Sequence, residues 1–103
     1  MSISEREIIS LAKERRIKWS SHAVRRMLER GISREEVLSC LLGDEIIERY
    51  PDDLPSPSCL VLGYHKDKPL HVVCAIGQGR LWIITVYRPS PERWSDDFRR
   101  RRG

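Results

Sequence analysis

The sequence predicts an α+β domain in which N-terminal helices pack on a four-stranded antiparallel β-sheet. Two helix-capping boxes lie in the first third of the chain, the hydrophobic period then shortens from about 3.6 to about 2 residues, and the later apolar runs are joined by short connections. At 103 residues and 40% hydrophobic content, the chain is sized for one domain around a single core. We expect one domain over residues 1–103, with helices at about 4–42, the sheet at about 45–88 and a C-terminal tail at 90–103.

The first and third helices are each expected to begin at a capping box, in which a serine is followed three residues later by a glutamate. These boxes lie at residues 4–7 and 33–36. An apolar residue before each serine can pack on an apolar residue in the first turn, forming a hydrophobic staple. The first helix should run to about Arg16, and Gly43 should end the third.

The second helix carries an apolar stripe and a basic stripe. Ser20 or Ser21 can cap its start, and Gly31 stands where a left-handed residue ends a helix. The apolar stripe, expected to face the core, consists of Ala23, Val24, Met27 and Leu28. The basic stripe consists of His22, Arg26 and Arg30. An imidazole and two guanidiniums suit an anionic ligand, and the alternative is an ordinary solvated basic face.

Four strand-like runs follow the helices, at residues 45–50, 58–65, 69–76 and 80–88. Short connections between most of them predict antiparallel neighbours, with the helices on one face of the sheet and the other face partly open. Beyond the sheet, Ser90-Pro91 is expected to start a turn or short helix that docks Trp94 and Phe98. Arg99 to Arg102 should then form a mobile basic end.

Charge is segregated along the chain. The net charge is +4, and residues 13–34 contain eight basic and two acidic side chains, whereas residues 44–53 contain five acidic and one basic. A basic patch of this kind could meet nucleic acid, an acidic protein or an anionic membrane surface.

The cysteines do not indicate a disulfide framework or a zinc site. Cys40, Cys59 and Cys74 are scattered, without a Cys-x-x-Cys pair or a histidine at ligand spacing. No apolar run approaches the length of about 18 residues that a membrane span requires. We therefore expect a cytoplasmic protein with no cofactor, no metal and no membrane partner.

The third strand run places a histidine among aliphatic side chains. His71 shares its face with Val73 and Ala75, so it is either a half-buried side chain satisfied by a neighbour or part of a site. Thr85 and Tyr87 repeat this pattern on the next strand, where strand propensity alone could account for them.

Short blocks of sequence, spread in order over nearly the whole chain, carry a family resemblance. The blocks are Ser21-His22-Ala23, Arg26-Met27, Arg30-Gly31-Ile32-Ser33, Ile47-Glu48, Tyr50-Pro51, Leu62-Gly63, Pro69-Leu70-His71-Val72-Val73, Thr85, Tyr87, Pro89 and Trp94. They are similar to the small prokaryotic domain-of-unknown-function family 4258. That family resembles the RelE-like (barnase/EndoU/colicin/RelE-type) small toxins. The resemblance implies helices followed by an antiparallel sheet, metal-independent RNA cleavage and a small antitoxin as partner.

Cleavage of RNA by its own 2′-hydroxyl, without a metal, needs a base, cations near the phosphorus and an acid. His22 and His71 could supply the base and the acid, in either order. The expected catalytic set is His22, His71, Arg30 and Tyr87. The expected RNA- and phosphate-binding set is Arg25, Arg26, Arg88 and Thr85. This mechanism requires the basic stripe and the face that bears His71 to converge.

Two functions therefore stay open. The first is a toxin-like endoribonuclease of a toxin–antitoxin pair that acts on RNA, with ribosome-associated mRNA as one candidate substrate. The second is a noncatalytic module in which the basic helix binds RNA, an acidic antitoxin or another protein and both histidines are structural.

Overall fold

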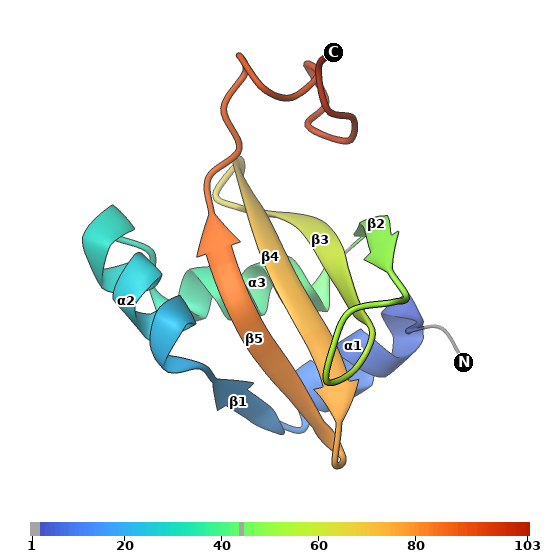
Figure 1. Cartoon of the computed structure of the whole chain (residues 1–103). Helices are drawn as coiled ribbons and strands as arrows, with labels where there is room; N and C mark the ends of the chain where they lie inside the picture. The colour runs from blue at the N-terminus through green and yellow to red at the C-terminus, as the bar shows by residue number, and fades with distance from the viewer. Residues whose placement is uncertain (1–2, 44) are drawn as a thin grey trace.

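The structure, a computed structural model, describes residues 3–43 and 45–103, so Asp44 of the predicted acidic segment lies outside the described residues. Within this part of the chain, two of the three helices lie on one face of a five-stranded sheet, and the helix at residues 21–30 lies beside the strand at residues 80–87, as Figure 1 shows. The predicted α+β class is confirmed. The predicted sheet of four antiparallel strands is incomplete, because a fifth strand pairs in parallel at one edge.

The helices begin where their caps predict. They are α1 (Glu5–Lys13), α2 (Ser21–Arg30) and α3 (Arg34–Leu42). Capping boxes are formed at both predicted positions, and Gly31 ends α2 in the left-handed conformation at φ 64°. The first helix ends at Lys13, earlier than expected, because Arg15 adopts φ 59° and turns the chain away.

The sheet has the strand order β1-β5-β4-β3-β2. Its strands are β1 (Ile17–Trp19), β2 (Glu45–Tyr50), β3 (Ser58–His65), β4 (Lys68–Gly77) and β5 (Arg80–Tyr87). The last four form the predicted antiparallel meander. The strand β1 is parallel to β5, and its three residues are too few to show a period in the sequence.

Helix α2 continues the edge of the sheet where β1 ends. The strand β1 pairs with β5 only as far as Ile83, and beyond it α2 satisfies the exposed carbonyls of β5. The hydroxyl of Ser20 donates to the Ile84 carbonyl at 3.2 Å, and Arg30 Nη1 donates to the Val86 carbonyl at 2.8 Å. These bonds fix the basic end of α2 against the end of β5.

The apolar stripe of α2 is narrower than predicted. Ala23 and Met27 are buried in the core as expected. Leu28, which was expected to face the core, is 80% exposed, because α2 packs against β5 through the side of the helix that bears Ala23 and Met27. The prediction for Leu28 is therefore wrong.

The close packing of α3 on the sheet depends on one glycine. A Cβ atom added at Gly63 of β3 would lie 2.6 Å from the Cα, carbonyl oxygen and Sγ atoms of Cys40 on α3. Only a residue without a side chain permits this approach. Helix α3 therefore lies directly against β3 at this position.

The opposite face is partly covered by the C-terminal tail. A turn forms after Ser90-Pro91, which is one of the two predicted alternatives, with the amides of Arg93 and Trp94 donating to the Ser90 carbonyl at 3.2 and 3.0 Å. The tail then turns back so that Trp94 and Arg101 pair across an isolated antiparallel bridge. The predicted free basic end instead forms ion pairs, among them Arg99 Nε to Glu45 Oε2 at 2.8 Å. The tail therefore docks at the end of the sheet where β5 ends (Figure 1).

Candidate functional site

A cavity of about 770 Å³ opens where the end of α2, the end of β5 and the C-terminal tail meet. It is lined by Arg30, Tyr87, Arg88, Ser90, Arg93, Trp94 and Arg101. Four of these seven side chains are guanidiniums, and no carboxylate is among them. The cavity is therefore a place for an anion with several acceptor oxygens.

Three of the four arginines are oriented by hydrogen bonds. Arg30 donates to the Val86 carbonyl at 2.8 Å. Arg88 Nη2 pairs with Glu36 of α3 at 2.9 Å. Arg101 Nε and Nη2 donate to the two carboxylate oxygens of Glu48 at 2.8 and 3.0 Å. Each guanidinium has five N–H donors, so these contacts leave donors available to a ligand in the cavity.

A tyrosine–histidine pair lies at the wall of the cavity. His71 and Tyr87 are directly opposite each other on β4 and β5, and Tyr87 Oη lies 3.1 Å from His71 Nδ1. His71 is fully buried, with Nε2 lying 3.0 Å from the backbone carbonyl of Phe98. A carbonyl only accepts, so Nε2 carries the proton, and Nδ1 of the neutral ring accepts from the Tyr87 hydroxyl.

Burial shifts the acid–base properties of both rings. Desolvation lowers the pKa of His71 below its ordinary value, against the opposing effects of the Phe98 carbonyl and the Glu48 charge. Desolvation also raises the pKa of Tyr87. At neutral pH the pair is therefore a neutral phenol donating to a neutral imidazole.

The tail holds this pair in place. Trp94 is 3% exposed and meets His71 edge to face, with ring centroids 4.4 Å apart. The Arg101 guanidinium carbon lies 4.7 Å from the centroid of the Trp94 ring, and the same guanidinium is bonded to Glu48. The aromatic ring is thus fixed between His71 and a guanidinium that is itself ion-paired.

The carboxylate that anchors the tail is shared by two donors. Glu48 accepts from Arg101 and from the hydroxyl of Tyr50. Burial alone would raise the pKa of Glu48, but the hydrogen bonds from Arg101 and Tyr50 bring it below its ordinary value. Burial and the adjacent Glu48 raise the pKa of Tyr50 to about 12. Glu48 therefore stays charged at neutral pH and keeps its hold on the tail.

The structure brings together some of the predicted site residues. Arg30, Tyr87 and Arg88 line the cavity, and His71 lies directly behind Tyr87. The convergence of the basic helix with the face that bears His71 thus occurs at the end of α2, through Arg30.

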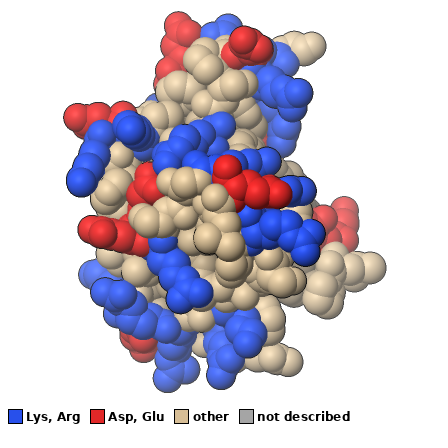
Figure 2. Space-filling view, turned by 90° about the vertical axis from the view of Figure 1, so that its left-hand side faces the viewer, with Lys and Arg blue, Asp and Glu red and all other residues tan. Residues whose placement is uncertain are grey.

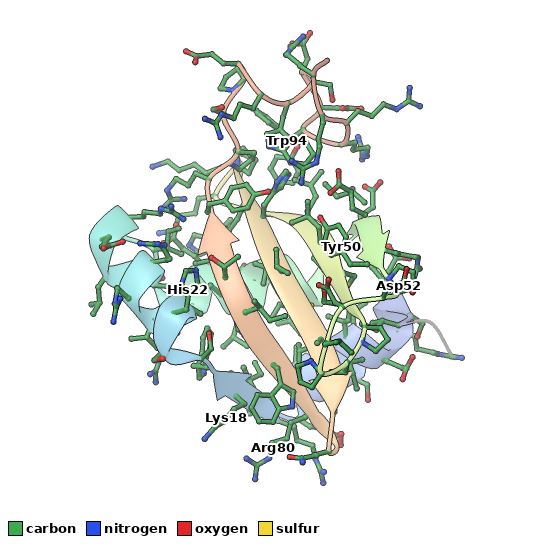
Figure 3. All side chains as sticks on the ribbon, in the orientation of Figure 1. Lys18, His22, Tyr50, Asp52, Arg80 and Trp94 are labelled. Atoms are coloured by element: carbon green, nitrogen blue, oxygen red, sulfur yellow. The ribbon has the colours of Figure 1, made fainter. Side chains whose placement is uncertain are left out.

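Other predicted site residues lie away from the cavity. His22 is exposed on the first turn of α2, about 12 Å along the helix axis from Arg30 at about 1.5 Å per residue. Figure 3 labels it beside β5, well below Trp94. Arg25 is exposed on the same helix, and Arg26 pairs with Glu29 at 2.6 Å.

On the sheet, Thr85 is half-buried opposite Val73 and does not line the cavity.

The contribution of the tail to the cavity was not predicted from the sequence. Arg93, Trp94 and Arg101 form a wall of the cavity, and Glu48 anchors that wall. Trp94 was expected only to dock on the domain, and Arg99 to Arg102 were expected to form a mobile basic end. The nearest signal in the sequence is that the strand at 45–50 is acidic and the C-terminal end is rich in arginine. This signal suggests that the two segments attract each other, but it does not say which arginine pairs with which carboxylate.

In residues 3–43 and 45–103, no group of three or more His, Cys, Asp or Glu side chains is placed to hold a metal ion. No helix in the same part of the chain has the length and apolar character needed to cross a membrane.

Comparison with known proteins places the chain in a family. Searches of curated proteins and of solved structures find no match. A family model described as domain of unknown function (DUF4258) matches residues 19–88, which run from the end of β1 through β5. The match contains His71, Tyr87 and the arginines at the ends of α2 and β5, and it stops before the tail. The chain belongs to the DUF4258 family.

Proposed function

We propose that this chain is a toxin-like, metal-independent endoribonuclease that acts on RNA and is held in check by a small antitoxin in the cytoplasm. The observation that carries the proposal is the cavity in which four guanidiniums surround a tyrosine backed by a buried, neutral histidine. The order of three helices followed by the antiparallel meander β2 to β5 supports a likeness to the RelE-like toxins.

In this proposal the arginines bind and stabilise the scissile phosphate. Arg30, Arg88, Arg93 and Arg101 reach the cavity from α2, from β5 and from the tail, so they can contact different oxygens of one phosphate. Negative charge increases on those oxygens as the 2′-oxygen attacks, and donors already oriented for it lower the barrier. Arg30, Arg88 and Arg101 are already oriented, because protein acceptors hold their side chains.

The proton of the 2′-hydroxyl passes through Tyr87 to His71. The 2′-oxygen gives its proton to Tyr87 Oη while the tyrosine gives its own proton to His71 Nδ1, which lies 3.1 Å away. The bond from the 2′-oxygen to phosphorus forms, the bond from phosphorus to the 5′-oxygen breaks, and the 5′-oxygen takes a proton from water. His71 then returns its proton through Tyr87 to the hydroxide that this water leaves, which restores the neutral pair. The products are a 2′,3′-cyclic phosphate and a free 5′-hydroxyl.

This relay replaces the direct pairing of His22 with His71. His71 is fully buried and both of its ring nitrogens are hydrogen-bonded, so it meets substrate only through Tyr87. His22, Arg25 and Arg26 are instead proposed to contact the RNA strand outside the cavity, along α2.

The test is cleavage of single-stranded RNA by the purified chain in EDTA. The expected products carry 2′,3′-cyclic or 3′-phosphate ends, and an otherwise identical 2′-deoxy strand should be bound but left intact. Arg30→Gln with Arg93→Gln should lower the cleavage rate by at least about a hundredfold, since the pair removes two of the four guanidiniums of the cavity, and the loss of one oriented donor such as Arg30 is worth about that factor. Arg6→Gln with Lys68→Gln removes the same charge from exposed positions outside the cavity and should leave the rate unchanged.

A noncatalytic RNA- or protein-binding module is the second candidate. The burial of His71 with both nitrogens occupied favours it, because a structural histidine has the same appearance. Failure of the parent chain to cut a range of RNAs, with and without ribosomes, while it binds the 2′-deoxy strand would favour this candidate.

A further inference from the structure

A second basic concavity lies at the other end of β5. It measures about 410 Å³ and is lined by Arg15, Arg16, Ile17, Gln78, Gly79 and Arg80. Figure 3 labels Arg80 and Lys18 at this end of the sheet, opposite the end where Trp94 and the first cavity lie. Three guanidiniums from two separate turns therefore share one depression.

The two turns are locked side by side by the backbone. The amide of Leu81 donates to the carbonyl of Arg16 at 2.8 Å, directly before the parallel pairing of β1 with β5. Gln78 and Gly79 adopt φ 54° and 69°, which makes the β4–β5 connection a tight turn. A Cβ atom added at Gly79 would lie 3.8 Å from Arg16 Nη1, so the Arg16 guanidinium lies over this turn.

These arginines have little carboxylate compensation. Among the described residues, the one ion pair that involves them joins Arg16 Nε to Glu14 Oε1 at 4.0 Å, between side chains that are both largely exposed. The arginines of the tail differ, since Arg99 and Arg101 each hold a carboxylate at 2.8 Å. A cluster of cations without close counter-charges is the pattern expected where the counter-charge arrives with a ligand.

We propose that Arg15, Arg16 and Arg80 form a second phosphate-binding site, which holds the same RNA strand that the first cavity cleaves. The inference rests on the proposed function. The eight residue steps from Arg80 to Arg88 span about 26 Å at about 3.3 Å per residue. A stacked strand that rises about 3.4 Å per nucleotide along its axis covers that distance with about eight nucleotides.

The surface between the two sites suits a phosphate backbone. Helix α2 lies beside β5 along this interval, and its exposed His22 and Arg25 face solvent there. Figure 2, which views this side of the molecule, shows Lys and Arg side chains from one end to the other, with acidic side chains between them. The RNA therefore runs along the α2 edge of the sheet, and a strand shorter than the interval reaches only one site.

The experiment measures the binding of fluorescent single-stranded 2′-deoxy oligonucleotides, which cannot be cut through a 2′-hydroxyl. The variant is Arg16→Gln with Arg80→Gln, and the charge-matched control is Arg6→Gln with Lys68→Gln. For an oligonucleotide of about 12 residues, the variant should bind at least about tenfold more weakly. The slope of the logarithm of the association constant against the logarithm of the salt concentration should decrease in magnitude by about 1.4, at about 0.7 for each of the two lost phosphate contacts. For one of about 4 residues, affinity should change by no more than about twofold, because the first cavity remains available.

The outcomes separate this inference from the proposed function. If the Arg16/Arg80 variant binds the long strand as tightly as the parent, or if the control weakens binding equally, the second site is refuted even where the parent cleaves RNA. If the parent does not cleave RNA but the variant shows the expected length-dependent loss, the cleavage proposal fails and the second site stands. Thermal unfolding of both variants at the parent temperature confirms that the comparison is between folded proteins.

Discussion

Replacing Tyr87 by phenylalanine removes one hydroxyl group from the centre of the candidate site and leaves the ring in place. In the parent this hydroxyl donates to His71 Nδ1 at 3.1 Å, and His71 is fully buried, so the variant leaves a buried acceptor without its donor. That loss should lower the free energy of unfolding by about 1–3 kcal/mol. For a domain of this size, each kcal/mol corresponds to a fall of about 4–8 °C in Tm.

The effect of Tyr87→Phe on activity should be larger than its effect on stability. If Tyr87 relays the proton, cleavage should fall by at least about a hundredfold in EDTA at a temperature where the variant is fully folded. Binding of a 2′-deoxy strand should stay within about twofold of the parent, because the arginines are untouched. Tyr64→Phe is the matched control, since Tyr64 is exposed on β3 and does not line the cavity. A folded Tyr87→Phe variant that cuts RNA at the parent rate would refute the relay.

The packing of α3 on the sheet, the burial of His71 and the anchor of the tail can each be changed by one substitution. Gly63→Ala should lower the free energy of unfolding, measured by chemical denaturation, by about 1–3 kcal/mol or more, because the added Cβ would lie 2.6 Å from atoms of Cys40 on α3. Gly43→Ala is the control and should be tolerated, because the nearest atom to its added Cβ, the Ser39 carbonyl oxygen, is 3.9 Å away. The pKa of His71 is lower in the folded chain than its ordinary value of 6.5, so the unfolded chain binds more protons between the two pKa values. The stability that His71 contributes above about pH 6.5 should therefore be lost as the pH falls through the folded-state pKa. His71→Gln should remove this pH dependence of the free energy of unfolding, measured by denaturation at several pH values, and His22→Gln should keep it. Glu48→Gln should weaken the anchor of the tail by about 1 kcal/mol, a value that allows for solvent screening of a partly exposed pair, and raise amide hydrogen exchange in residues 94–101 by about fivefold.

The parts of the fold that were predictable are those with local chemical signals. Both capping boxes, the left-handed Gly31 and the four meander strands depend on residues within a few positions of one another. The strand β1 was missed because it has three residues and a partner more than sixty positions away. The exposure of Leu28 was missed because periodicity defines a stripe on a helix but not how much of that stripe its neighbour covers.

The candidate site was predictable in its residue types and only partly in its geometry. Arg30, Tyr87 and Arg88 were expected and lie together, because the edge of β5 is completed by α2. The position of His71 beside Tyr87 could not be predicted without the register of β4 with β5. That register includes a bulge between Val73 and Cys74, which no residue type in the sequence indicates. The contribution of the tail needed ion pairs between segments about fifty residues apart.

The tail does more than close the cavity, because it determines the state of the histidine. Without the carbonyl of Phe98, either nitrogen of a neutral His71 could carry the proton, and the Tyr87 hydroxyl would have no assured acceptor. Burial against Trp94 disfavours the charged ring, so the same segment that selects the tautomer also keeps the imidazole neutral. The family match ends before this segment. In this chain the acid–base properties of a family position therefore depend on contacts supplied from outside the matched region, and the reactivity of Tyr87 should depend on whether the tail is docked.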